Sequence, residues 1–401
     1  MSQPSVSTTS STDNHDSGMT PALMFFFAFC CGAIVANLYY TQPIIELIAP
    51  DLQMAPSTAS LIVSITQIGY AIGMLFLVPL GDIVENRKFI LTMCVVSLVS
   101  LVALAIVQQP SIFLLLSLFI GFSSVGVQLL IPLASHMTPL ESRGRVVGNI
   151  MSGVIFGILL ARPVASVIAD HFGWRSVMWL AAAVMVLIVL VLLRYLPRRE
   201  PTHASSYASL IRSLGGLVMT LPTLRHRAFY QGCQFAIFSM FWTAVPLELS
   251  RTYGISQSGI ALFALVGAVG AFAAPIAGRL ADAGHTKPAT FAALTGAILC
   301  GIIAYESELI GVYGLALVGV LLDFCVQLNM VLGQRAIFSL APEIRSRLNA
   351  LYMTSIFVGG AIGSAIASTL YENHGWHGIS IALCCFPLAA LLVFLTKGRK
   401  I

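Results

Sequence analysis

The stretch LVGVLLDFCVQLNMVLGQR, residues 317–335, is apolar for most of its length but holds an aspartate, Asp323, at its seventh position. An apolar run of about 20 residues predicts a helix that crosses a membrane. Asp323, Gln327, Met330 and Gln334 fall at i, i+4, i+7 and i+11, so a helix would align them as one stripe. Because polar groups are costly against lipid, this stripe must face protein or a water-filled cavity.

The rest of the chain has a similar composition. Of its 401 residues, 58% are hydrophobic and 9% are charged, whereas soluble domains carry about 25% charged residues. Apolar runs of spanning length recur throughout, so we predict an all-α integral membrane protein. Residues 1–20 are rich in Ser and Thr and lack the features of a secretory signal, so we expect a disordered cytoplasmic tail there.

Polar breaks divide the chain into twelve predicted transmembrane helices. They cover residues 21–45, 58–80, 89–107, 111–135, 146–168, 174–193, 228–249, 258–280, 288–304, 309–334, 349–370 and 377–396. The longest break follows the sixth helix. We therefore expect an N-terminal six-helix half at 21–193, a cytoplasmic linker at 194–227, a C-terminal six-helix half at 228–396 and a cytoplasmic tail at 397–401.

The basic residues predict the orientation of these helices. On this division, 17 of the 21 Lys and Arg residues lie in breaks on the side of the N-terminus, and two lie in breaks on the other side. Lys and Arg concentrate in cytoplasmic loops. Both termini are therefore predicted to be cytoplasmic.

The two halves also carry matching motifs. ESRGR at 141 matches EIRSR at 343, FGWR at 172 matches HGWH at 374, and PLGDI at 79 matches RLADA at 279. The offsets are 202, 202 and 200 residues. Two parallel six-helix repeats are a transporter architecture, in which the substrate site lies between the repeats near the middle of the bilayer.

With these motifs, the sequence after residue 20 resembles the major facilitator superfamily, in particular its bacterial drug and metabolite efflux branch. PLGDIVENRK at 79–88 and GRLADAGHTK at 278–287 resemble the two copies of its loop signature, and ANLYYTQPI at 36–44 is similar to the efflux branch. GNIMSGVIFGILLARP at 148–163 resembles its antiporter motif. The resemblance implies a twelve-helix fold in a bacterial inner membrane.

The resemblance also implies a gate at the cytoplasmic side. Asp82 would meet the N-terminus of the eleventh helix only when the two halves close there. The expected gating residues are Asp82, Arg87, Arg143, Arg145, Asp282, Arg345 and Arg347. Small residues allow helices to approach closely, so Gly148, Gly153, Gly157 and Pro163 are expected at a helix contact that seals or slides between the halves. Alternatively, Asp82 is a plain loop residue and the arginines only fix topology.

Helices one, four, seven and ten would surround the central cavity on this resemblance. The candidate substrate- and proton-binding residues are Asp323, Gln327, Arg162, Asn37, Tyr40, Gln128, Gln234, Phe238 and Trp242. Such side chains would suit an amphipathic or cationic organic molecule. Two structural alternatives remain: Asp323 could be a buried partner of Arg162, and Arg162 could extend to the outer membrane surface.

The leading functional hypothesis is a proton-coupled exporter of small organic compounds that works by alternating access. A facilitator or importer of a sugar- or amino-acid-like metabolite is the alternative, and a membrane sensor or enzyme is the third. The sequence has no GxxxxGK[ST] loop, and its spans hold no histidine cluster. We expect no enzymatic activity, cofactor, metal or nucleic acid partner. The expected partners are lipid, protons and the organic substrate, and we expect a monomer.

Overall fold

The computed structural model describes residues 20–81, 83–139, 142–198, 206–341 and 344–397. All regular elements in these ranges are helices, which confirms the predicted all-α class. Eight of the described helices are long and apolar enough to cross a membrane, and one of them, α16, contains two helical segments. Of the predicted tails at 1–20 and 397–401, residues 1–19 and 398–401 lie outside the described residues.

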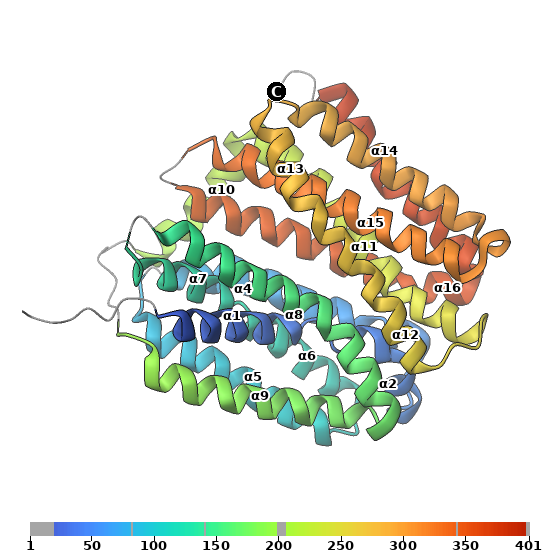
Figure 1. The fold of residues 1–401 in the computed structure, drawn as a ribbon, viewed down its shortest axis with the longest axis horizontal. Helices are drawn as coiled ribbons and strands as arrows, with labels where there is room; N and C mark the ends of the chain where they lie inside the picture. Colours follow the sequence, from blue (N-terminus) through green and yellow to red (C-terminus); the bar gives the residue numbers. More distant parts are fainter. Residues whose placement is uncertain (1–19, 82, 140–141, 199–205, 342–343, 398–401) are drawn as a thin grey trace, which may run out of the picture.

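The helices between residues 21 and 195 form one side of the molecule (Figure 1), which we call the first group. They are α1 (Pro21–Ala36), η1 (Gln42–Ile44), α2 (Ile45–Asp51), α3 (Pro56–Ala59), α4 (Leu61–Leu80), α5 (Asn86–Ile106), α6 (Pro110–Ser124), α7 (Val127–His136), α8 (Arg143–Phe172) and α9 (Trp174–Tyr195). Within this group α1 packs on α8, α4 on α6, and α5 on α9.

The helices between residues 222 and 397 form the second group. They are α11 (Pro222–Arg251), α12 (Gln257–Ala264), the 3-10 helix η3 (Leu265–Phe272), α13 (Ala273–Asp282), α14 (Thr286–Tyr305), α15 (Ser307–Phe338) and α16 (Arg345–Lys397). The two groups meet where α4 packs along α16 and where α8 packs against α12. Inside the predicted linker, α10 (Tyr207–Thr220) contacts α4, α11 and α16, so it touches both groups.

Three predicted spans are not single helices. The first span ends as a helix at Ala36 and continues through η1 into α2, the fourth is divided between α6 and α7, and the eighth contains η3. Pro43 lies in the first predicted span and Pro132 in the fourth, and the N–H that proline lacks weakens a continuous helix. These breaks decide which side chains face the interior, as the site shows below.

The FGWR and HGWH repeats have one structural cause. Gly173 separates α8 from α9 with φ 79°, and Gly375 divides α16 with φ 61°, both in the left-handed region that favours glycine. The tryptophan that follows each glycine is buried, and its indole N–H donates a hydrogen bond: Trp174 to Asp51 and Trp376 to the carbonyl oxygen of Ala304. Each motif therefore forms the sharp turn between two antiparallel helices.

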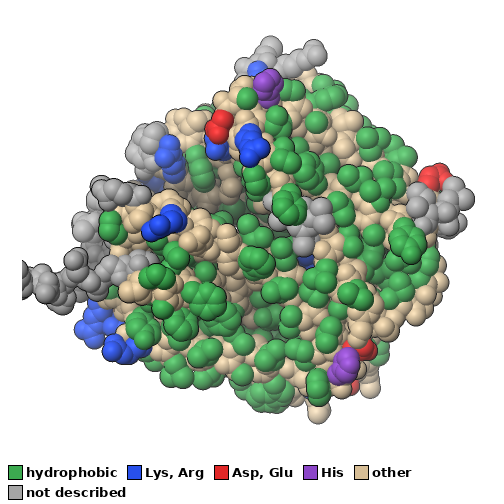
Figure 2. Space-filling model, viewed as in Figure 1, with side chains coloured by type: hydrophobic (Ala, Val, Ile, Leu, Met, Phe, Trp, Pro, Cys, Tyr) green, Lys and Arg blue, Asp and Glu red, His purple; other side chains and the backbone are tan. Residues whose placement is uncertain are grey.

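The outer surface carries many large apolar side chains. Large side chains such as Phe156, Leu190 and Ile381 are more than half exposed, and hydrophobic side chains cover most of the face shown in Figure 2. Lipid is the solvent in which such a surface is stable.

Candidate substrate and proton site

Arg162 lies in the interior of the molecule, on α8. Only 3% of it is exposed, so it does not extend to the membrane surface as one of the sequence alternatives proposed. Its Nε donates a hydrogen bond of 3.0 Å to Oε1 of Gln42 in η1. Its guanidinium carbon lies 5.2 Å from the ring centre of Tyr39, 5.3 Å from that of Phe238 and 4.6 Å from that of Trp242. Cation–π attraction to three rings partly replaces the hydration that a buried guanidinium loses.

Asp323 is the buried charge of opposite sign, and it belongs to the second group. It is 8% exposed on α15, and its Oδ1 accepts a hydrogen bond of 2.8 Å from the indole Nε1 of Trp242 on α11. Trp242 thus contacts both charged side chains, the aspartate through its N–H and Arg162 through its ring face. Arg162 and Asp323 form no direct ion pair among those found in the described residues. The two charges therefore share one buried site across the boundary between the groups.

The break in the eighth predicted span leaves room for Asp323 to lie directly against the backbone of that span. A Cβ placed on Gly267 would lie 2.6 Å from Oδ2 of Asp323, and one on Gly270 would lie 2.5 Å from its Cβ. Both glycines belong to η3, a 3-10 segment inside a span. Such segments often mark hinges, and here the missing side chains leave room for the carboxylate.

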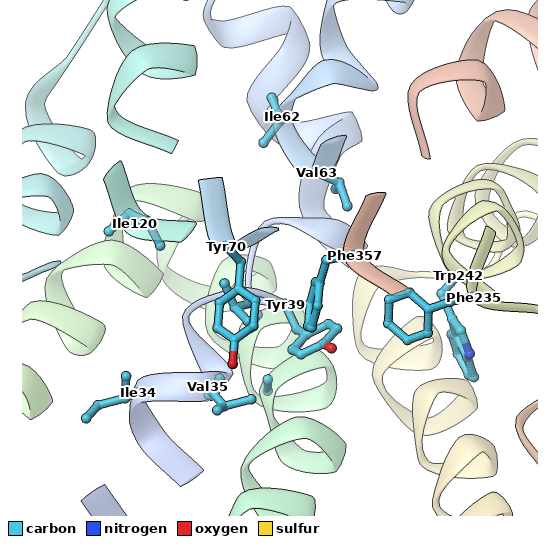
Figure 3. Packing of buried hydrophobic residues seen from close by; sticks show 14 of the residues in the cluster. Ile34, Val35, Tyr39, Ile62, Val63, Tyr70, Ile120, Phe235, Trp242 and Phe357 are labelled. Carbon is cyan, nitrogen blue, oxygen red and sulfur yellow. The ribbon is translucent and has the colours of Figure 1, made fainter. Parts of the chain in front are cut away.

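The site also contains three residues that were not among the sequence candidates: Tyr39, Gln42 and Thr243. Tyr39 and Gln42 come from the irregular end of the first span, and Gln42 Nε2 donates to Oγ1 of Thr243 at 3.2 Å. Figure 3 shows Tyr39 and Tyr70 of the first group beside Phe357 of the second. The ring centres of Tyr70 and Phe357 are 4.3 Å apart. The motif ANLYYTQPI contained two of the residues, but the pattern of a regular helix does not predict how they point.

The structure separates some of the predicted residues from the site. The amide of Asn37 donates to Oγ of Ser97 within the first group, and Gln234 Nε2 donates to the carbonyl oxygen of Ala293 within the second. Gln128 Nε2 donates to the hydroxyl of Tyr70, next to the boundary between the groups. Tyr40 and Gln327 are half-buried. Of the predicted set, Arg162, Asp323, Phe238 and Trp242 form the contacts of the site.

A polar seam joins the two groups from this site to one end of the molecule, which we call the sealed end. Oγ of Ser64 and Oγ of Ser364 are 2.9 Å apart, and Gln67 Nε2 donates to Oγ of Ser239 at 2.8 Å. Closer to the end, Ser60 Oγ donates to the carbonyl oxygen of Ala365 at 2.9 Å.

Contacts at the tip complete the sealed end. Arg251 binds Glu46 of the first group at 2.7 Å and Glu372 of the second at 2.5 Å. Ser258 donates to Asp170, and Gln257 Nε2 donates to the carbonyl oxygen of Pro43 at 2.6 Å. Apart from the Arg251–Glu372 pair, which lies within the second group, these contacts cross the boundary between the groups and close this end of the molecule.

The predicted gating residues lie at the opposite end, which we call the open end, and their contacts remain within a group or reach the linker helix. Arg87 donates to the carbonyl oxygen of Leu193, Arg143 to that of Thr138 and Arg345 to that of Phe338. Asp282 pairs with Arg335, and Arg347 donates to Ser213 of α10. Arg145 is exposed, and Asp82 lies outside the described residues.

The surface agrees with an open end. In Figure 2 a hollow lies between the two groups, on the side where most Lys and Arg side chains gather. None of the ion pairs found in the described ranges joins the groups there. Among the described residues, the predicted gating residues therefore form no ion pair between the two groups in this conformation.

The glycines of the antiporter-like motif pack inside the first group and not between the groups. A Cβ on Gly153 would lie 2.4 Å from the carbonyl oxygen of Ala28, and one on Gly157 would lie 2.1 Å from that of Gly32. Both glycines thus bring α8 against α1, while Gly148 has no atom within 4 Å of such a Cβ. Pro163 is buried beside Arg162. The expected contact between the halves at these glycines is not what the structure shows.

Comparison with known proteins identifies the class. The chain matches the model of the Major Facilitator Superfamily over residues 24–222 and 227–400, and it belongs to this family. It is therefore a membrane transporter of the major facilitator kind, as the sequence motifs predicted.

Individual relatives are also transporters. The uncharacterized transporter YgaY of Escherichia coli is 37% identical over 382 residues, which cover 95% of this chain and 96% of YgaY. The "probable sugar efflux transporter" of Helicobacter pylori is 23% identical and covers 94% of this chain and 97% of its own. Among solved structures, a D-xylose-proton symporter superposes with a TM-score of 0.72 at 16% identity, covering 94% of this chain and 98% of the symporter. That likeness shows the fold.

Proposed function

We propose that this transporter exports a small organic compound in exchange for protons. The observation that carries this proposal is the buried site in which Asp323 and Arg162, from opposite groups, both contact Trp242. A carboxylate can take up and release a proton, whereas a guanidinium remains charged. A proton and a substrate that compete for the same buried carboxylate give the exchange that an antiporter needs.

The surroundings of Arg162 indicate the chemical class of the proposed substrate. Its Nη2 is buried and has no hydrogen-bond partner among the described residues, so a bound molecule with an oxygen acceptor would satisfy it. The rings of Tyr39, Phe238 and Trp242 offer apolar faces beside that donor. A purely cationic substrate, which the sequence suggested, would meet the guanidinium charge. We therefore propose an amphipathic molecule with a carbonyl, hydroxyl or carboxylate group.

Alternating access supplies the transport step. The seam closes one end while the other is open, and rocking of the two groups about the site would exchange these roles. Since most basic residues lie at the open end, we propose that it faces the cytoplasm of a bacterial inner membrane and that the described conformation is inward-open. The "probable sugar efflux transporter" among the relatives supports export.

An importer of a hydroxyl-rich metabolite is the second candidate. The buried amides of Gln42 and Gln67 and the hydroxyl of Thr243 lie near the site, and amide and hydroxyl groups bind sugar hydroxyls well. The direction of proton-driven flux separates the two candidates.

The deciding experiment uses purified protein in liposomes with an imposed pH gradient. A thermal-shift screen of sugars, amino acids and drug-like compounds first supplies a ligand, because binding to the native state raises stability. The wild type should move this ligand against its gradient, driven by proton flow in the opposite direction. Asp323→Asn should retain the fold and lose the gradient-driven component, since an amide cannot titrate.

Glu248→Gln is the matched control. Glu248 is also buried in the second group, but its Oε2 accepts a hydrogen bond of 2.7 Å from the hydroxyl of Tyr371, away from Arg162. This variant should still pump. If Asp323→Asn pumps and Glu248→Gln does not, the proton travels by another carboxylate and our assignment is wrong.

A further inference from the structure

A second set of polar groups surrounds a pocket in the second group, at the open end. The pocket has a volume of about 350 Å³ and lies between α11, α14, α15 and α16. Its lining consists of basic, hydroxyl and apolar residues, with no Asp or Glu among the described ones: Thr223, His226, Arg227, Tyr230, Thr286, Lys287, Ala336, Ser339, Leu340 and Phe394. It is separate from the site of Arg162 and Asp323.

The lining presents positive charge. Arg227 and Lys287 approach the pocket from different helices, and Arg227 Nη1 donates a hydrogen bond of 2.7 Å to Oγ1 of Thr290. Thr286 and Lys287 are the first residues of α14, whose N-cap residue His285 makes no side-chain capping hydrogen bond. The N-terminus of a 20-residue helix adds partial positive charge and backbone N–H donors.

The buried hydroxyl of Tyr230 indicates a position where a ligand could bind. Tyr230 is only 2% exposed, and its hydroxyl has no hydrogen-bond partner in the described residues. The same holds for Nδ1 of His226, whose ring stacks on that of Tyr230 with centres 6.3 Å apart. Buried polar atoms are costly when unpaired, so an acceptor that enters this pocket would stabilise both residues.

A larger and more apolar opening adjoins the pocket. Its volume is about 830 Å³, it shares His226, and it is lined also by Pro222, Arg225, Phe229, Val393, Thr396 and Lys397. Phe229 is 43% exposed. Partial burial and the positive charges of Arg225 and Lys397 lower the pKa of His226, as expected where the potential favours an anion.

We propose that these two openings bind one anionic phospholipid of the cytoplasmic leaflet. The phosphate would lie in the smaller pocket against Arg227, Lys287 and the hydroxyl of Tyr230, and an acyl chain would follow Phe229 and Val393. Basic pockets between transmembrane helices on this side of a membrane suit anionic headgroups. The apolar opening favours a lipid over free phosphate. This inference does not depend on the substrate or direction of transport.

Native mass spectrometry of the purified full-length protein tests the proposal. Dioleoyl phosphatidylglycerol should bind at least about tenfold more tightly than dioleoyl phosphatidylcholine, and Arg227→Gln and Lys287→Gln should each weaken its binding about fivefold, as expected for one basic residue near an anionic surface. Arg194→Gln and Arg212→Gln remove exposed charges outside the pocket and should leave the affinity unchanged.

Tyr230→Phe separates lipid binding from folding. Because the hydroxyl has no protein partner in the described ranges, its removal should leave lipid-free thermal stability unchanged or higher, while affinity for phosphatidylglycerol falls. Equal affinities for the two lipids, or equal losses in the pocket and control variants, would overturn the proposal. So would competition by millimolar inorganic phosphate that is as effective as unlabelled phosphatidylglycerol, since the site would then bind the free ion.

Discussion

The sealed end and the open end hold the same kinds of side chain but use them differently. At the sealed end, Arg251 pairs with Glu46 across the two groups. At the open end, Asp282 pairs with Arg335 inside the second group, and Arg143 is bonded within the first. Among the described residues, charged side chains thus connect the groups at one end, and at the other they bond within a group or to the linker helix α10.

This difference shows that weak contacts keep the sealed end closed. The seam consists of hydrogen bonds and one partly exposed ion pair between the groups, among the contacts of the described residues. Each such contact contributes about 0.5–1.5 kcal/mol. Polar groups can also exchange their partners for water. Because each of these polar contacts is weak, the balance between the ends can respond to what Asp323 and Arg162 bind.

The largest expected effect concerns which end faces the cytoplasm. Single cysteines replacing Ser206, at the start of α10, and Thr252, at the end of α11, lie in exposed positions at the open and sealed ends respectively. A membrane-impermeant maleimide added to intact cells should label only the cysteine at 252, because basic loops face the cytoplasm. After cell lysis both should react. Labelling at 206 alone in intact cells would reverse the assignment of the two ends and with it the inward-open state.

An intermediate effect is expected from reversing the charge at the sealed end. Arg251→Glu would place three carboxylates together where Glu46 and Glu372 now share one guanidinium. Because Arg251 is about half exposed at 46%, solvent screening limits each lost contact to at most about 1 kcal/mol. Only the contact with Glu46 joins the groups, and the variant also replaces this attraction by repulsion between two carboxylates, so the population should shift toward opening of the sealed end by about tenfold. Spin labels at positions 109 and 374, both exposed near this end, should report longer distances.

Arg175→Glu is the control for that measurement. Arg175 also pairs with an aspartate at the sealed end, Asp51, but both residues belong to the first group. Its charge reversal should leave the distance between the groups unchanged. Equal changes in the two variants would mean that the ion pairs stabilise local structure and do not hold the groups together.

The sequence predicted the buried charged residues better than it predicted the contacts between the two groups. Asp323 and Arg162 interrupt apolar runs, and a charge in such a run must be buried in protein or face water. By contrast, Glu46 and Arg251 lie 205 residues apart in polar breaks, where no periodic pattern indicates a partner. The repeats and the apolar runs predicted the all-α membrane fold but not the breaks in the first, fourth and eighth spans.

Local geometry explains the errors within the site. Asn37 and Tyr40 were candidates because the family resemblance places the first helix at the cavity. The first span leaves the helical pattern after Ala36, and Tyr39 and Gln42 contact Arg162 instead. On α11, Gln234 precedes Trp242 by eight residues, which rotates it by about 80° around a regular helix. It consequently points to α14, as its bond to Ala293 shows.

The smallest expected effect is on the seam itself. Ser64→Ala combined with Ser364→Ala removes both partners of a buried contact, so no unpaired group is left behind, and the cost to the closed state should be about 0.5–1 kcal/mol. The same spin-label pair should then show about a two- to fivefold gain in the population open at the sealed end. Ser117→Ala is the matched control, since within the described residues its hydroxyl donates to the carbonyl oxygen of Phe113 on its own helix and does not reach the second group. A shift equal to that of Arg251→Glu would show that the seam, and not the ion pair, holds the sealed end. No shift beyond the control would mean that the serines only pack, leaving Arg251 with Glu46 as the contact that distinguishes the two ends.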